Sequence, residues 1–214
     1  MKISNSSLLA HFQAATGVCT DTRKIQAGNM FFALKGPNFN ANAMAEEALA
    51  KGACCAIIDD PAYDTGSKTL VVNDGLRALQ DLATAYRKTL SIPVIGLTGS
   101  NGKTTTKELI LSVLSQQFNC FATTGNLNNH IGVPLSILSI QATHEIAVIE
   151  MGANKHGDIK ELVDIAQPTH SLITNIGKAH LEGFGGEQGV IKGKGELFDY
   201  VAANSGYVFL PKDK

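Results

Sequence analysis

The sequence predicts an α/β protein of two domains whose mostly parallel sheets are covered by helices. Short strands that are apolar throughout alternate with helical segments, which is typical of parallel sheets buried on both faces. In the second half, a glycine-rich turn joins one such strand to a helix, as in a phosphate-binding loop. We place the boundary near residue 90, so that the expected domains are 1–90 and 91–214.

The first domain is expected to be small and α/β. The expected strands are 28–34, 54–58 and 70–72, and the expected helices are 43–51 and 74–88. The first helix is rich in Ala and ends at Gly52, a residue that commonly follows a helix. The second begins after Asp74, a good N-cap, and its leucines recur at helical spacing.

The second domain repeats the alternation of strands and helices. The expected strands are 94–98, 146–149, 171–174 and 207–210, and the expected helices are 103–117 and 157–166. Only Pro211 and three more residues follow the last strand. We therefore expect the second domain to be incomplete in this sequence.

Composition excludes several classes of protein. The chain has 214 residues, 44% of them hydrophobic, so it can bury a sizeable core and is not disordered. A net charge of −1 without charged blocks, no Trp and 6% aromatic residues argue against general nucleic-acid binding. No apolar run approaches the roughly 20 residues that cross a bilayer, and the amino terminus does not resemble a signal peptide.

The four cysteines predict neither a metal site nor a redox motif. Cys19, Cys54, Cys55 and Cys120 form no C-x-x-C pair. We expect free thiols in a reducing compartment, and therefore a cytoplasmic protein.

Residues 98–106, TGSNGKTTT, are the most specific local signal, and we call them the phosphate loop. Backbone amides at the start of the helix can bind phosphate oxygens, Lys103 can reach the β- and γ-phosphates, and the Thr104 hydroxyl can ligate Mg²⁺. The usual pattern has a glycine five positions before Gly102, where this chain has Leu97. The loop is therefore a variant. A purely structural turn is the alternative interpretation.

The phosphate loop resembles the nucleotide loop of the Mur ligases, the ATP-dependent amino-acid ligases of peptidoglycan synthesis. The resemblance extends over nearly all of the chain. Residues 19–23 and 28–36 are similar to the UDP-binding domain of two branches of the family. Residues 105–108, 125–134 and 175–185 resemble the branch that adds D-alanyl-D-alanine to UDP-N-acetylmuramoyl-tripeptide.

This resemblance implies a three-domain enzyme, with a UDP-sugar domain, a central ATPase domain and a carboxy-terminal domain. The chain would contain the first domain and part of the second, and we expect it to be inactive alone. The reaction implied is amide formation through an acyl phosphate, with ATP and two Mg²⁺ ions as cofactors. The implied partners are the UDP-tripeptide and D-Ala-D-Ala, without nucleic acid or membrane insertion, and the expected state is a monomer.

The resemblance also implies roles for individual residues. The expected nucleotide-binding residues are Gly99, Ser100, Asn101, Gly102, Lys103, Thr104 and Thr105. The expected catalytic residues are Lys103, Glu150, His180 and Lys194, and the expected metal ligands are Thr104, Glu150, His180 and Lys194. Glu150 also fits this role by position, because a carboxylate at the end of a parallel strand beside a phosphate loop can hold Mg²⁺. Lys194, in preference to Lys192, takes the position at which several members carry a carbamylated lysine.

Substrate contacts are expected in both domains. Asn126, Asn128 and Asn129 carry amides that suit a peptide with free carboxylates, although a turn rich in Asn is also a common loop structure. Thr22, Arg23 and Asn42 are the candidates for the UDP-sugar, since an arginine suits a diphosphate. Two alternatives stay open: a sister ligase that adds the third amino acid, and a fragment that binds UDP-sugar or nucleotide without turnover. A motor or switch ATPase is a more distant possibility.

Overall fold

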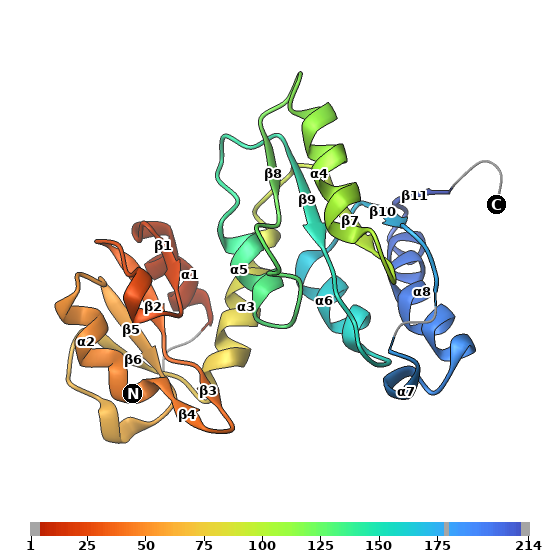
Figure 1. Cartoon of the computed structure of the whole chain (residues 1–214). Helices are drawn as coiled ribbons and strands as arrows, with labels where there is room; N and C mark the ends of the chain where they lie inside the picture. The colour runs from red at the N-terminus through yellow and green to blue at the C-terminus, as the bar shows by residue number, and fades with distance from the viewer. Residues whose placement is uncertain (1–4, 178–179, 211–214) are drawn as a thin grey trace. The chain divides into compact units, whose positions relative to one another are not determined.

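The computed structural model describes residues 5–177 and 180–210. The chain divides into two compact units, Met1–Tyr86 and Arg87–Lys214, which are described separately (Figure 1). No described helix is long and apolar enough to pass through a bilayer.

The first unit contains a four-stranded parallel sheet of order β1-β2-β5-β6. Its strands are β1 (Gly17–Cys19), β2 (Asn29–Phe32), β5 (Cys55–Ile58) and β6 (Thr69–Val71), and its helices are α1 (Asn5–Ala14), α2 (Ala45–Ala50) and α3 (Gly75–Arg87). A short antiparallel pair, β3 (Lys35–Gly36) and β4 (Phe39–Asn40), and the 3₁₀ turns η1 (Thr22–Lys24), η2 (Ala41–Met44) and η3 (Pro61–Tyr63) complete it.

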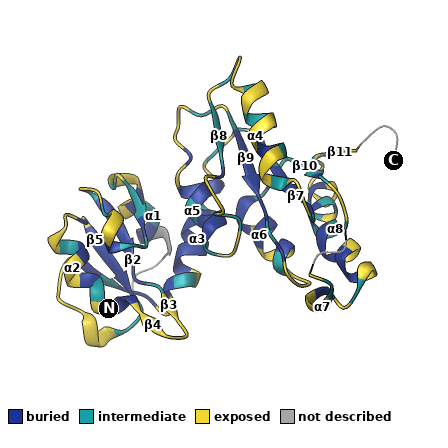
Figure 2. Cartoon of the chain, in the orientation of Figure 1, coloured by how far each residue is buried: buried dark blue, intermediate teal, exposed yellow. Residues whose placement is uncertain are grey.

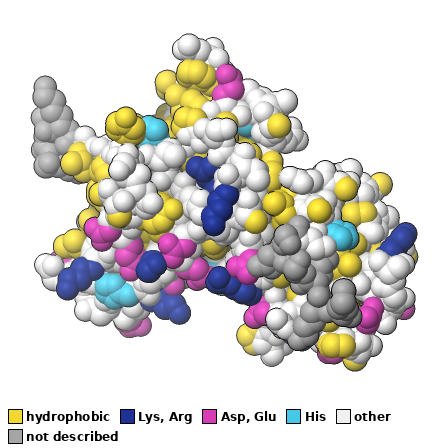
Figure 3. All heavy atoms as spheres, turned by 180° about the vertical axis from the view of Figure 1, so that it is seen from behind, with side chains coloured by type: hydrophobic (Ala, Val, Ile, Leu, Met, Phe, Trp, Pro, Cys, Tyr) yellow, Lys and Arg dark blue, Asp and Glu magenta, His cyan; other side chains and the backbone are white. Residues whose placement is uncertain are grey.

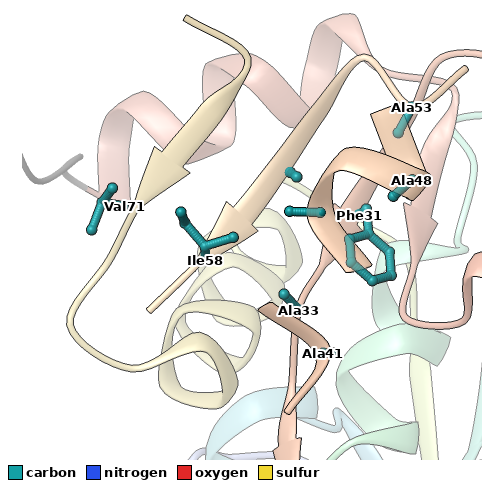
Figure 4. Packing of buried hydrophobic residues seen from close by; sticks show 9 residues of the cluster. Phe31, Ala33, Ala41, Ala48, Ala53, Ile58 and Val71 are labelled. Carbon is teal, nitrogen blue, oxygen red and sulfur yellow. The ribbon is translucent and has the colours of Figure 1, made fainter. Parts of the chain in front are cut away.

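Small side chains let α2 pack closely on one face of this sheet. Phe31 and Ile58 fill the core of that face, against alanines that include Ala45 and Ala48 (Figure 4). Side chains alternate along a strand, so Met30 and Phe32 point to the opposite face. All of β2 and β5 is buried, as expected for a sheet covered on both sides (Figure 2).

The second unit contains a five-stranded parallel sheet of order β11-β10-β7-β9-β8. Its strands are β7 (Val94–Thr98), β8 (Cys120–Ala122), β9 (Ile146–Glu150), β10 (His170–Ile173) and β11 (Tyr207–Phe209). Its helices are α4 (Lys103–Leu114), α5 (Gly132–Leu138), α6 (Asp158–Ala166), α7 (Leu181–Phe184) and α8 (Glu187–Ala203). Because β7 comes first in this unit and lies at the centre of the sheet, the strand order reverses there. Ligands of open parallel sheets bind at such a point, beyond the carboxyl ends of the strands.

Helices cover the two faces of this sheet unequally. Gly96 of β7 faces Leu197 of α8 and Pro168, whereas Ile95 faces α4. On the α4 side an apolar groove lies between the helix and the β10–β11 half of the sheet, lined in part by Val113 and Phe209. Val113 is 70% exposed and Phe209 is 50% exposed.

This exposed apolar face leads to a prediction about self-association. We expect Val113→Lys to reduce association at high concentration, because it places a charge within a contiguous apolar patch. The free energy of unfolding should change by no more than about 0.5 kcal/mol, as for most surface substitutions. Light scattering and urea unfolding measure the two effects. Unchanged scattering would show that this face does not drive association.

The predicted fold class is confirmed, and every strand and helix that was expected has a counterpart within a few residues. Asp74 caps α3, since its carboxylate accepts from the Arg77 amide at 2.8 Å. The prediction missed α1, β1, the β3–β4 pair, β8, α5, α7 and the whole of α8. Glycines made α8 hard to recognise because they disfavour helices. The structure explains Gly189, where a Cβ would overlap the main-chain carbonyl of Phe184.

Candidate functional site

The phosphate loop joins β7 to α4 at the centre of the sheet. Its first residue, Thr98, is held by a buried hydroxyl that donates to the Met151 carbonyl at 2.8 Å. Helix α4 begins at Lys103, and the Lys103 ammonium donates back across the loop to the Gly99 carbonyl at 2.9 Å. Amides at the start of this helix point toward the loop, so the geometry suits an anion.

The loop after β10 holds the start of the phosphate loop. The Asn175 carbonyl accepts from the Ser100 amide at 3.0 Å, and the Asn175 side chain accepts from the Asn101 amide at 3.1 Å. The Ser100 hydroxyl accepts from the Gly177 amide at 2.9 Å, and Thr174 donates to the Asn101 carbonyl at 2.7 Å. The segments 98–106 and 174–177 are therefore one hydrogen-bonded unit.

Four residues, Thr104, Thr123, Asn128 and Glu150, form what we call the Glu150 cluster. The Glu150 carboxylate is buried at the carboxyl end of β9 and accepts from the Thr104 hydroxyl at 3.0 Å and from the Asn128 amide at 2.8 Å. The Glu150 main-chain amide donates to the Thr123 hydroxyl at 3.0 Å. Carboxylate and hydroxyl oxygens are ligands that Mg²⁺ prefers, so this cluster fits a magnesium site.

Lys194 is buried within α8, with 1% of its surface exposed, whereas Lys192 is exposed. Burial, with a smaller contribution from the nearby positive charge of Lys103, lowers the pKa of Lys194 to about 8. Its ammonium lies 5.6 Å from the centre of the Phe184 ring. The structure thus brings Lys194 close to the phosphate loop, and a substantial fraction of its amine is neutral near pH 8.

His180 is exposed and has left-handed backbone angles, φ 55° and ψ 35°, directly before α7. Its neighbours Lys178 and Ala179, which belong to the 175–185 motif, lie outside the described residues. Within the described ranges, no hydrogen bond joins His180 or Lys194 to the Glu150 cluster, and no group of three His, Cys, Asp or Glu side chains could hold a metal. Of the predicted metal ligands, the structure joins Thr104 and Glu150 by a hydrogen bond.

Arg23 and Thr22 lie side by side in η1 of the first unit. The Arg23 guanidinium forms a two-bond pair with the Asp21 carboxylate, at 2.9 and 2.7 Å. This pair holds the pKa of Asp21 well below its usual range. The Arg23 side chain is 85% exposed, so its guanidinium stays accessible to a ligand, whereas Thr22 is buried.

Asn42, a predicted substrate contact, is fully buried. Its amide nitrogen donates to Asn40 and Asp59, and its oxygen accepts from the Asp59 amide at 2.9 Å. The predicted stretch around it is thus a structural link between η2 and the end of β5. Because these bonds occupy both ends of the amide, we do not retain Asn42 as a ligand contact.

The three asparagines after β8 differ in what their side chains do. Asn128 donates to Glu150, and Asn129 caps the start of α5 by accepting from the Gly132 amide at 2.8 Å. Asn126 is exposed. Of these predicted substrate contacts, Asn126 and Asn129 are both exposed, so either can meet a ligand, whereas Asn128 is bonded to Glu150.

Sequence reasoning missed two residues that build the site, Lys107 and Thr123. Lys107 lies one helical turn after Lys103 and is buried, although lysines are almost never buried without a partner. Thr123 sits where β8 ends. The only sequence signal was that Lys107 falls in the segment 105–108, and that signal did not indicate burial.

The surface agrees with the nearly balanced charge of the sequence. Acidic and basic side chains are interspersed on the face in Figure 3 and do not gather by sign. A face of this kind does not favour phosphate backbones in general.

Comparisons with known proteins identify the family. Residues 97–214 match the model of the Mur ligase middle domain, which is more than half of the chain. The chain belongs to the Mur ligase family. This result confirms the resemblance drawn from the phosphate loop and from the motifs around it. It also agrees with the parallel sheet of the second unit.

Individual relatives are similar over most of this Mur ligase chain. The UDP-N-acetylmuramoyl-tripeptide–D-alanyl-D-alanine ligase of Escherichia coli K12 is 43% identical over 187 residues, which are 87% of the chain and 41% of the relative. A crystal structure of MurF from Acinetobacter baumannii has a TM-score of 0.85 and 34% identity, covering all of this chain and 49% of that one. A MurF ligase from Thermotoga maritima, solved in complex with ADP, has a TM-score of 0.80 and 34% identity over 88% of this chain and 44% of its own. The chain thus spans about two fifths of the length of the curated relatives it matches.

Proposed function

We propose that the chain belongs to an ATP-dependent ligase that adds D-alanyl-D-alanine to UDP-N-acetylmuramoyl-tripeptide. The observation that carries this proposal is the phosphate loop beside the Glu150 cluster, in a chain about 40% identical to ligases of that name. In this proposal residues 1–90 bind the UDP-sugar and residues 91–214 bind ATP. The proposed location is the cytoplasm, where ATP is available, and the proposed state is a monomer.

The proposed reaction has two steps. A carboxylate oxygen of the tripeptide attacks the γ-phosphorus of ATP, so that a P–O bond forms and ADP leaves. The amine of D-Ala-D-Ala then attacks the acyl carbon, phosphate leaves with its bonding electrons, and the amine loses a proton. Lys103 and the loop amides favour this chemistry because they face the charge that develops on the transferring phosphoryl group.

Magnesium, when bound, would neutralise charge on the phosphates. Thr104 and Glu150 would hold it, since their oxygens already lie within hydrogen-bond distance of each other. Asn128 would orient the other oxygen of the carboxylate. A second ion held by His180 and Lys194 is part of the proposal because the Mur ligase resemblance implies it.

A carbamate on Lys194 would make that side chain a suitable ligand. The neutral amine nitrogen attacks the carbon of CO₂, an N–C bond forms, and a proton is released, so a cation becomes an anion. Burial and the lowered pKa of Lys194 support this step because they favour the neutral amine. Native mass spectrometry with added bicarbonate should detect one CO₂ adduct, which Lys194→Met removes and Lys192→Met keeps.

Substrate preference is the direct test of the proposed branch of the family. Thr22, Arg23, Asn126 and Asn129 are the proposed contacts to the UDP-tripeptide. Calorimetric titration of the chain should detect tighter binding of UDP-N-acetylmuramoyl-tripeptide than of the dipeptide form or of UDP. Tighter binding of the dipeptide form would contradict the assignment to D-Ala-D-Ala addition and would favour the sister ligase, and UDP binding without peptide preference would mean that the central domain lacks a formed acceptor site. Binding to none of the three by folded protein would contradict the UDP-sugar assignment.

Lys103→Met should weaken binding of ADP to the chain. The variant removes a charged donor to the phosphates. Because such a hydrogen bond is worth roughly 1.5–3 kcal/mol, the affinity should fall by about 10- to 100-fold. Titration of Mg·ADP into both proteins measures it. Lys160→Met is the matched control, because that lysine is exposed on α6 and pairs with Asp164, away from the phosphate loop. Equal affinity of the Lys103 variant and wild type would contradict a role of the phosphate loop.

A further inference from the structure

Lys107 is the buried cation nearest to the phosphate loop along α4. It has 1% of its side chain exposed, and its ammonium donates to the Thr123 carbonyl at 2.5 Å. It also pairs with the Glu108 carboxylate at 2.9 Å, but Glu108 is 59% exposed. A buried ammonium is costly unless it is bonded, so the Thr123 carbonyl is its principal buried partner.

Thr123 connects this bond to the Glu150 cluster. Its amide donates to the Val148 carbonyl of β9 at 3.0 Å, and its hydroxyl accepts from the Glu150 amide at 3.0 Å. The carbonyl bound by Lys107 therefore belongs to the residue that holds the main chain of Glu150. Thr104, on the same helix as Lys107, binds the carboxylate of Glu150. Helix α4 thus contacts Glu150 directly through Thr104 and indirectly through Lys107.

The same bond fixes the start of the loop that carries the asparagines. Thr123 is the first residue after β8, and Asn128 reaches back to the Glu150 carboxylate at 2.8 Å. The Asn128 carbonyl also accepts from the Gly152 amide at 2.7 Å, just beyond β9. Both ends of the segment 123–128 are therefore bonded to the region around Glu150.

We propose that Lys107 is a positioning residue, which fixes Thr123 and thereby orients the Glu150 carboxylate for a divalent cation beside the nucleotide. This inference rests on the proposed function for the identity of the ligand, and it concerns a residue that does not touch that ligand. Outer residues that orient a metal ligand typically change metal affinity by about 10- to 100-fold when they are removed.

The experiment compares Lys107→Met with wild type in ADP titrations with Mg²⁺ and with EDTA. Methionine keeps the length and apolar character of the stem and removes the donor. We expect the affinity measured in EDTA to be unchanged, because the loop amides and Lys103 are intact. We expect the gain in affinity that Mg²⁺ provides to fall by about tenfold. Glu108→Gln, which keeps the bond to Thr123, and Lys160→Met are the controls and should behave as wild type.

A double-variant cycle identifies the route. Thr123→Val removes the hydroxyl that holds the Glu150 amide but keeps the carbonyl bound by Lys107. If Lys107 acts through Thr123, Lys107→Met should reduce the gain in ADP affinity from Mg²⁺ less in the Thr123→Val background than in wild type. Full additivity would overturn the proposed route. If Lys107→Met lost the same factor of ADP affinity in Mg²⁺ and in EDTA and was also less stable, its role would be purely structural and the proposal would be overturned.

Amide exchange tests the proposal without a nucleotide. Lys107→Met should accelerate exchange of the Glu150 amide and leave α6 and α8 unchanged. If wild type binds no ADP, the proposed function fails, and this measurement still decides the role of Lys107. An unchanged exchange rate of the Glu150 amide would overturn the proposed positioning role of Lys107.

Discussion

Gly132→Ala should destabilise the second unit by about 3 kcal/mol and should disrupt the loop before α5. A Cβ at this position would overlap the main chain of Leu127, which cannot move aside as a flexible side chain can. Leu127 is held in place, since its carbonyl accepts from the Ser136 hydroxyl at 3.3 Å. Displacing Leu127 also displaces Asn128, the residue that donates to Glu150. We therefore expect lower stability in urea and a smaller gain in ADP affinity from Mg²⁺.

Gly195→Ala is the matched control for this variant. Gly195 also lies in a helix of the second unit, and a Cβ there would meet nothing within 4 Å. Alanine favours helices over glycine, so this variant should be as stable as wild type or more stable by up to about 1 kcal/mol. If Gly132→Ala unfolded at the same urea concentration as wild type, the close approach to Leu127 would not constrain the loop.

The sequence was sufficient for the parts of the molecule that depend on local pattern. Strand β9 is a continuous apolar run that ends in a carboxylate, and the phosphate loop follows another such run, β7. Their place in the sheet followed from general rules for parallel strands, so Thr104 and Glu150 were expected to lie close together. The structure has them joined by a hydrogen bond.

Tertiary contacts decided the features that the sequence did not indicate. Asn42 and Asn126 are the same residue type, yet Asn42, in η2, is buried with its amide occupied and Asn126, in the loop after β8, is exposed. By sequence Lys107 resembles a surface lysine, and only its contact with the carbonyl of Thr123, 16 residues away, shows that it is buried. The glycines of α8 argue locally against a helix, and the main chain of Phe184 explains Gly189. None of these contacts has a local signature.

Lys194→Met should stabilise the chain at neutral pH and remove a rise in stability at alkaline pH. The folded state lowers the pKa of Lys194 from 10.5 to about 8, so between these values the unfolded chain binds more protons. The contribution of Lys194 to the free energy of unfolding should therefore be constant below about pH 8 and rise as pH increases toward 10.5. With allowance for screening by solvent, the rise should be about 2 kcal/mol.

Urea unfolding between pH 7 and about 10, in buffer depleted of CO₂, measures this difference. Depletion matters because a carbamate on Lys194 would replace the ammonium whose burial is being measured. Lys194→Met should be more stable than wild type at pH 7 and equal to it near pH 10, since the neutral amine of wild type no longer carries a buried charge. Lys192→Met, which changes an exposed lysine of the same helix, should follow the wild-type curve. Parallel curves for Lys194→Met and wild type would mean that the buried amine is not destabilised in the folded chain, and the physical basis for its reaction with CO₂ would be lost.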